Sequence, residues 1–128
     1  MNENFYGHLT IIGMRGCEKF VSMVDDYLRD WRKTGNVSFI TVPELTRFGT
    51  GEGKCVLHNS MRGHDIYIIA DVFNYGVKYK MYGQEHSMSP DDHFQDLKRL
   101  IGAIEGKARR ISVIMPMLYE GRQHKRSM

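Results

Sequence analysis

The feature that most constrains the fold is a set of short apolar runs rich in β-branched residues, separated by segments with helical periodicity. These runs occupy residues 8–14, 65–70 and 111–117. Apolar strands alternating with helices are typical of a parallel sheet covered on both faces, with right-handed crossovers between the strands. The sequence therefore predicts an α/β domain with three layers and a mostly parallel sheet.

Two segments carry the three-to-four spacing of amphipathic helices. The first begins at Gly16 and ends near Gly35, a typical C-cap residue. The residues that share one of its faces are Phe20, Val24, Tyr27, Leu28 and Trp31. The second begins at Ser89, with proline in the first helical position and acids in the first turn. Its apolar side carries Phe94, Leu97, Leu100, Ile101 and Ile104.

The remaining segments carry weaker signals. Residues 37–42 are predicted to form a further strand that ends at Pro43, and residues 46–53 form a glycine-rich loop. A short strand at residues 54–58 is expected to belong to a small antiparallel flap. Residues 72–88 contain many tyrosines but no clean period, so we predict a loop or a small irregular element.

Size and composition limit the class of protein. A chain of 128 residues with a net charge of +3 is long enough for one domain with a real core. No run approaches the roughly 20 apolar residues of a membrane span, and the N-terminus lacks the pattern of a signal peptide. The two cysteines, Cys17 and Cys55, have no metal-like spacing, and neither do the histidines. We expect free thiols, no metal site in this chain and a cytoplasmic location.

Residues 107–126 are strongly basic. They hold six Lys and Arg residues against one acid, Glu120. They follow the last predicted strand, and in open α/β sheets ligands bind beyond the carboxyl ends of the strands. A cationic cluster there favours a phosphorylated ligand, although a solvated tail would have the same composition.

Three segments in register resemble ribose-phosphate pyrophosphokinase (phosphoribosyl-pyrophosphate synthetase). Residues 108–123 resemble its last strand and Tyr-x-x-Arg-Gln turn. Residues 47–52 resemble its Arg-Phe-x-Asp-Gly-Glu adenine loop, and residues 59–69 its Ser-Val-Arg-Gly strand entry. The resemblance covers nearly the whole chain from about Leu9 onward and implies the phosphoribosyltransferase-like type of sheet.

The resemblance implies roles for individual residues in binding ATP. Phe48 would stack on adenine and Glu52 would help to hold the base, while Arg122 would meet the phosphates and Gln123 would hydrogen-bond the nucleotide. These roles suit the residue types, because an aromatic face matches a flat base and a guanidinium matches phosphate oxygens. The full set of predicted ATP-binding residues is Phe48, Thr50, Glu52, Arg122, Gln123 and His124.

The resemblance also implies a second site and shows departures from the family. Ser60 and Arg62 match a turn that lines a regulatory phosphate or nucleotide site between subunits. Thr50 stands where the family has aspartate, and His124 stands where aspartate usually follows Arg-Gln. Residues 72–88 form an insertion relative to the family.

The family reaction transfers diphosphate from ATP to ribose 5-phosphate with magnesium. The chain is expected to be the single amino-terminal domain (residues 1–128) of a two-domain synthetase whose carboxy-terminal domain, with the catalytic residues and magnesium ligands, is absent. Alone it would be inactive. We expect a homo-oligomer that binds ATP and ribose 5-phosphate in the intact parent. The alternative is a non-catalytic regulatory or scaffolding homologue. A nucleic-acid-binding protein is a third interpretation of the basic end and the Tyr-Lys segment, but we expect no nucleic-acid partner.

Overall fold

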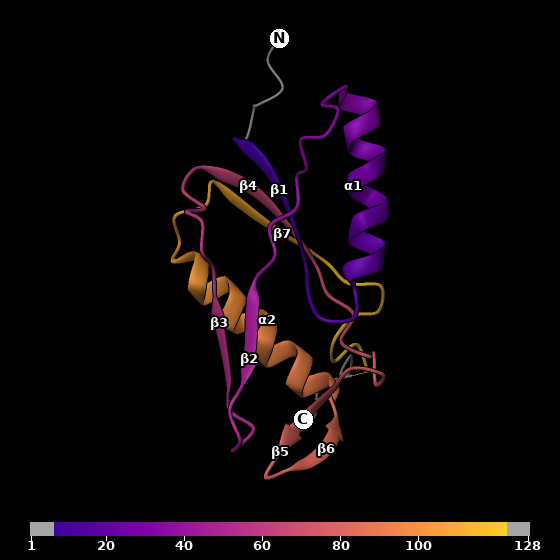
Figure 1. Cartoon of the computed structure of the whole chain (residues 1–128), viewed down its shortest axis with the longest axis vertical. Helices are drawn as coiled ribbons and strands as arrows, with labels where there is room; N and C mark the ends of the chain where they lie inside the picture. The colour runs from indigo at the N-terminus through magenta and orange to yellow at the C-terminus, as the bar shows by residue number, and fades with distance from the viewer. Residues whose placement is uncertain (1–6, 123–128) are drawn as a thin grey trace, which may run out of the picture.

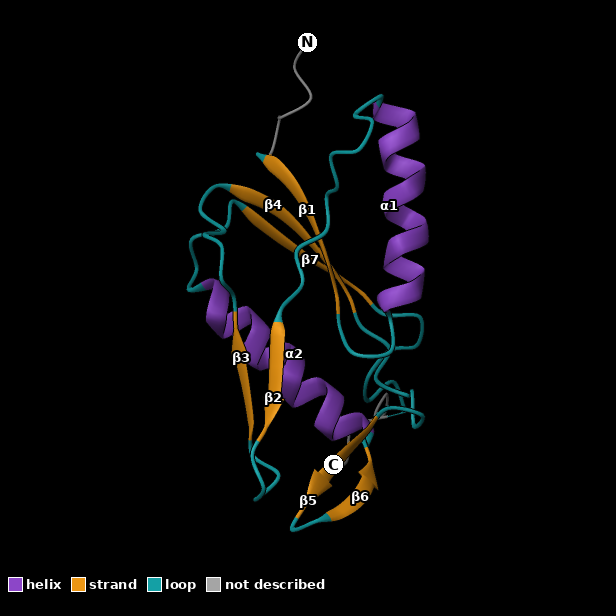
Figure 2. Ribbon diagram, in the orientation of Figure 1, coloured by secondary structure: helices purple, strands orange, loops and turns teal. Residues whose placement is uncertain are grey.

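The computed structural model describes residues 7–122 and has a parallel sheet at its centre (Figure 1). Three strands, β1 (His8–Gly13), β4 (His64–Ile69) and β7 (Arg110–Ile114), pair in the order β1-β4-β7. Helices α1 (Glu18–Arg32) and α2 (Pro90–Ile104) flank the sheet (Figure 2). The predicted α/β class with a parallel sheet is confirmed.

Besides the parallel sheet, the described residues form two antiparallel hairpins. The first joins β2 (Glu44–Arg47) to β3 (Gly53–Val56) and packs along α2, so the predicted flap is confirmed. The second joins β5 (Lys78–Met81) to β6 (Gln84–Ser87). The prediction of an irregular element for residues 72–88 was wrong here, because the hairpin depends on cross-strand hydrogen bonds that leave no periodic signal in so short a sequence.

The side chains of the sheet divide into two cores because successive residues of a strand point to opposite faces. Ile12, Ile66 and Ile68 are fully buried against α2. Ile11 and Ile69 point the other way and pack against α1. The two helices therefore cover opposite faces of the sheet, which gives the predicted three layers.

Helix α2 begins as its sequence predicts. The Ser89 hydroxyl accepts a hydrogen bond from the backbone N–H of Asp92 at 3.1 Å, and the Asp92 carboxylate accepts one from the Ser89 N–H at 2.9 Å. This capping box satisfies two backbone donors that the first turn leaves unpaired. The side chains of the predicted apolar side that are buried are Leu97, Leu100 and Ile104.

Helix α1 differs from its prediction in which face is buried. Val21 is 2% exposed and faces the sheet, whereas Phe20, Tyr27 and Trp31 are 55%, 80% and 78% exposed. The predicted apolar face is therefore split between the core and the surface. Among the residues 7–122, no helix is long and apolar enough to cross a membrane.

Two strand predictions need correction. Residues 37–42 contain only an isolated parallel bridge between Ile40 and Ile11, because the segment stays beside β1 for too short a distance to form a ladder. The last strand was predicted to be buried, but Val113 and Ile114 are 40% and 47% exposed. The reason is that β7 lies at an edge of the described sheet.

Candidate functional site

The loop at residues 48–52 forms the tip of the β2–β3 hairpin and holds three predicted ATP-binding residues. The Phe48 N–H donates to the Glu52 carbonyl at 2.9 Å, which closes the loop. The Thr50 hydroxyl donates to the Glu52 carboxylate at 2.9 Å. The Phe48 ring is 50% exposed. The loop therefore presents an aromatic face beside a carboxylate, a suitable pair for a flat base with exocyclic amino groups.

Arg47 anchors this loop from beneath. Its side chain is 7% exposed, and its guanidinium donates to the Gly51 carbonyl at 2.8 Å and to the Asp96 carboxylate at 3.2 Å. A third bond reaches the Asp92 carbonyl at 3.4 Å, and the group lies 4.8 Å from the centroid of the Tyr79 ring. Arg47 thus links β2, the loop, helix α2 and strand β5. Sequence reasoning missed this role because nothing local distinguishes a buried arginine from an exposed one.

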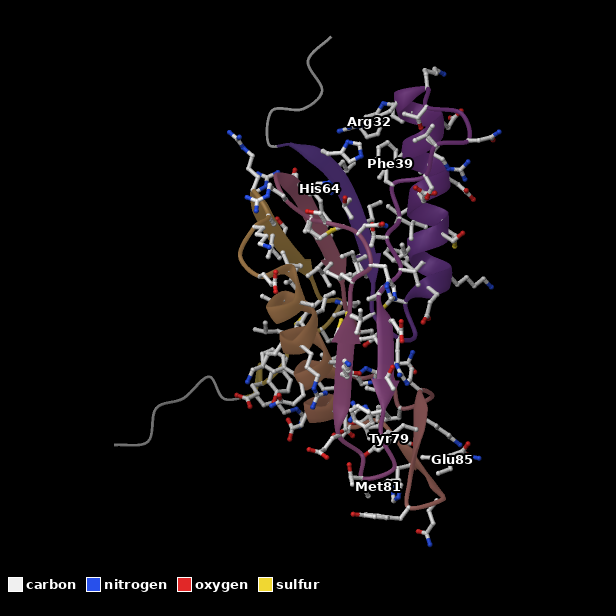
Figure 3. The ribbon with its side chains drawn as sticks, turned by 60° about the vertical axis from the view of Figure 1, so that its left-hand side comes forward. Arg32, Phe39, His64, Tyr79, Met81 and Glu85 are labelled. Carbon is white, nitrogen blue, oxygen red and sulfur yellow. The ribbon has the colours of Figure 1, made fainter. Side chains whose placement is uncertain are left out.

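The β5–β6 hairpin lies directly against the loop (Figure 3). The backbone N–H of Tyr82 donates to the Gly49 carbonyl at 2.8 Å. A β-carbon at Gly51 would lie 2.8 Å from the Met81 sulfur, and Gly51 has a φ of +91°. The positive φ therefore favours glycine there, whereas the flexible Met81 side chain could move away from an added β-carbon. The hairpin within residues 72–88 therefore lies against the 48–52 loop.

The turn at residues 117–122 packs on the start of α2. The Tyr119 ring stacks on Phe94 with centroids 4.1 Å apart. Its hydroxyl donates to Asp91 at 2.5 Å, and this bond is the main reason that the pKa of Tyr119 is raised to about 12. Arg122 lies beside a surface hollow that also contains Phe73 and Tyr75. The stacked ring and the hydrogen bond hold the chain that leads to Arg122.

The structure brings the two halves of the predicted ATP site to the same end of α2 without joining them. Arg47 bonds the Asp92 carbonyl and Tyr119 bonds the Asp91 side chain, so both segments flank the first turn of the helix. Phe48 is not among the residues that line the hollow beside Arg122. The predicted residues Gln123 and His124 lie outside the described residues.

The predicted regulatory turn lies at the other end of the sheet. The Ser60 hydroxyl accepts a hydrogen bond from the Arg62 backbone N–H at 3.2 Å, and both side chains are exposed. The next residue, Gly63, has a φ of +74° and donates its N–H to the Lys107 carbonyl at 3.0 Å. Ser60 and Arg62 therefore lie at the amino end of β4, close to Lys107.

A further groove, of about 390 Å³, lies between α1 and the sheet and was not predicted. Its walls include Leu9, Val24 and Ile114. At one end the Arg110 guanidinium donates to both carboxylate oxygens of Asp65 at 2.9 Å. None of the predicted site residues lines this groove, so it is separate from the candidate ATP site.

The two cysteines are free, as the sequence predicts. Burial raises the pKa of the Cys17 thiol, and burial together with the charge of Asp96 raises the pKa of Cys55 to about 11. The thiolate is the nucleophilic form of cysteine. Both side chains are therefore poor candidates for nucleophilic catalysis.

The family comparison agrees with the three motifs. Residues 9–128 match the model of the N-terminal domain of ribose phosphate pyrophosphokinase. The chain belongs to this family. No curated protein matched the chain in a sequence search.

The 48–52 loop and the 117–122 turn lie within two of the segments by which the sequence resembles this ribose phosphate pyrophosphokinase family. Residues 7–122 contain no group of three or more His, Cys, Asp or Glu side chains that could hold a metal ion.

Proposed function

We propose that this chain is the amino-terminal domain of a ribose-phosphate pyrophosphokinase that contributes ATP binding and subunit contacts. The intact parent would transfer diphosphate from ATP to ribose 5-phosphate. The observation that carries the proposal is the half-exposed Phe48 ring, held on a loop that Arg47 and the β5–β6 hairpin brace from two sides. A braced aromatic ring loses little conformational freedom when a base stacks on it.

Two groups would complete the nucleotide site. Glu52 would accept hydrogen bonds from the base, and Thr50, which already donates to Glu52, would orient that carboxylate. Arg122, with Gln123 and His124 next to it in sequence, would bind the phosphates. Because Phe48 does not line the hollow beside Arg122, we infer that the base and the phosphates contact different copies of the domain in a homo-oligomer.

The remaining assignments follow from the same proposal. Ser60 and Arg62 would bind a regulatory phosphate group, for which an exposed guanidinium beside a hydroxyl is a suitable partner. The magnesium ligands and the catalytic residues would lie outside this chain. The free cysteines fit a cytoplasmic enzyme.

ATP binding by Phe48 variants tests the central claim. Base stacking contributes about 1–3 kcal/mol per base, so Phe48→Ala should weaken ATP binding roughly 5- to 150-fold. Phe48→Tyr keeps the flat ring and should bind like the parent. Isothermal titration of both variants against ATP gives the comparison. Equal affinity of the alanine variant and the parent would refute the assignment.

A non-catalytic homologue is the second candidate. It is favoured by Thr50 in place of the family aspartate and by the β5–β6 hairpin, which packs against the 48–52 loop. The two candidates differ in activity. If the reading frame continues, the longer protein should release AMP from ATP and ribose 5-phosphate in the presence of magnesium and phosphate. Nucleotide binding without AMP release would support the regulatory candidate instead.

A further inference from the structure

One side of α1 exposes a continuous row of large apolar side chains, which we call the α1 stripe. Its members and their exposed fractions are Phe20 (55%), Met23 (59%), Tyr27 (80%) and Trp31 (78%). Their spacing of three, four and four residues keeps them on one face of a helix with 3.6 residues per turn. The stripe is separate from the buried side of the same helix, where Val21 and Asp25 are 2% and 4% exposed.

Such a row indicates a binding surface. Single exposed apolar residues are common on soluble proteins, but contiguous apolar patches mark sites of interaction. The three-to-four spacing is that of the seam between two packed helices. In Figure 1, α1 stands at one edge of the molecule, with its outer side turned away from the sheet and both hairpins. The surface is therefore open to another helix.

The charges beside the stripe indicate which helix would fit. Lys19 and Asp30 are eleven residues apart, about three turns, so they lie on the same flank of the stripe at opposite ends. Among the described residues, neither side chain has an ion-pair partner. A helix that binds the stripe should thus carry an acid opposite Lys19 and a base opposite Asp30.

The same helix in reverse direction meets both requirements. Met23 and Tyr27 are centred on residue 25, and Phe20 and Trp31 are centred within one residue of it. The midpoint of Lys19 and Asp30 also lies within one residue of position 25. Rotation by 180° about an axis near residue 25 therefore places the apolar side chains of one helix against those of the other. The same rotation brings Lys19 of each helix close to Asp30 of the other, which gives two pairs of opposite charge. An interface of this kind is self-complementary and closes as a dimer.

We propose that the α1 stripe binds the α1 stripe of a second copy of this chain, with the two helices antiparallel. Trp31 packs against the partner subunit's Phe20, and Tyr27 packs against the partner subunit's Met23. Lys19 pairs with the partner subunit's Asp30. This contact does not depend on the proposed nucleotide site, because α1 contributes no residue to the 48–52 loop or the 117–122 turn.

The size of the surface predicts a weak dimer. Large aromatic side chains bury about 150–250 Å² each when fully covered. With the exposed fractions given above, the two stripes would bury on the order of 1,000 Å² in total, near the lower end of specific interfaces. We therefore expect dissociation in the micromolar range rather than a permanent dimer.

The single tryptophan of the chain reports on the contact directly. Trp31 is 78% exposed in one copy and would be covered in the dimer, so its emission should shift to shorter wavelength as the concentration rises. Sedimentation velocity on the same samples should show a monomer–dimer equilibrium with the same midpoint. Tyr27→Lys places a charge in the centre of the stripe and should leave only monomer.

A charge exchange tests the antiparallel arrangement. Lys19→Asp and Asp30→Lys each turn two attractive pairs into repulsive ones and should weaken dimerisation roughly tenfold, because exposed pairs contribute modestly. The double variant regains both pairs and should dimerise like the parent. Lys98→Asp, a matched reversal on the exposed side of α2, should have no effect. Circular dichroism confirms that each variant is folded.

Three outcomes would overturn the proposal. The first is a monomer at every concentration, which would leave the stripe for a different protein or for further residues of a longer chain. The second is a dimer that Tyr27→Lys does not disrupt, which would place the contact elsewhere. The third is a double charge variant as weak as the single variants, because the antiparallel arrangement requires its recovery.

Discussion

Arg47 is predicted to be the most important polar side chain for the stability of the 48–52 loop. The substitution Arg47→Met keeps most of the aliphatic length of the side chain and removes the guanidinium. It deletes the bonds to the Gly51 carbonyl, the Asp96 carboxylate and the Asp92 carbonyl. It also deletes the contact with the Tyr79 ring.

The size of the effect follows from the burial of the pair. The side chains of Arg47 and Asp96 are 7% and 5% exposed, and removal of one partner of a buried pair costs about 3–5 kcal/mol. Two features reduce the cost. Arg99 still donates to Asp96 at 2.8 Å, and the substitution also removes Arg47 Nε, a buried donor that has no hydrogen-bond partner among the described residues. We therefore expect a loss of about 3 kcal/mol, a large part of the 5–15 kcal/mol typical of a domain.

Urea unfolding of a small set of variants measures this loss. Circular dichroism and tryptophan fluorescence should give the same midpoint, from which the free energy of unfolding is extrapolated. Arg47→Lys keeps the charge without the planar fork and should fall between the parent and Arg47→Met. Arg109→Met, at an exposed arginine, should change stability by less than about 0.5 kcal/mol.

A double-mutant cycle with Asp96→Asn separates the pair from the other contacts of Arg47. The double variant should lose less than the sum of the two single losses, by about 0.5–3 kcal/mol, because the second substitution removes an interaction that is already broken. A loss below about 1 kcal/mol for Arg47→Met, or strict additivity in the cycle, would refute the reasoning.

Two further predictions concern α2 and the amino end of the sheet. Ser89→Ala removes the N-cap acceptor and should cost about 1 kcal/mol in urea unfolding, whereas Ser87→Ala at an exposed position should be neutral; equal effects would contradict the capping role. Burial and the neighbouring His8 lower the pKa of His64, so the folded protein binds fewer protons than the unfolded chain as pH falls through the ordinary histidine value of about 6.5. The stabilising contribution of neutral His64 is thus complete above this value and is lost as pH falls. His64→Asn should therefore reduce the drop in urea midpoint between about pH 7.5 and about pH 5.5, and an unchanged drop would argue against this role.

Elements specified by local contacts were predicted well. The start of α2 depends on a serine, a proline and two acids within four residues, and the capping box in the structure uses these groups. The three strands of the parallel sheet were also located from their apolar runs. Both signals are local, because a cap forms within one turn and a buried strand must be apolar along its own length.

Elements specified by distant contacts were predicted poorly. The β5–β6 hairpin has no periodic pattern, and its position depends on a bond between Tyr82 and Gly49, which are far apart in sequence. The helical face of Phe20, Tyr27 and Trp31 is apolar by composition, yet in the described chain no other element packs over it. Periodicity shows that residues share a face but not what that face touches.

The candidate site likewise has features that local sequence specifies and features that depend on distant contacts. The sequence by itself determined the residue types of the site, with an aromatic residue and a carboxylate in a glycine-rich loop and a basic turn after the last strand. Only the tertiary structure decided that Arg47 connects this loop to α2, and that the loop and the basic turn flank the same end of that helix while Phe48 stays outside the hollow beside Arg122. The physical reason is that a motif records the chemistry needed at a position, whereas burial and distance depend on segments that meet only when the chain folds.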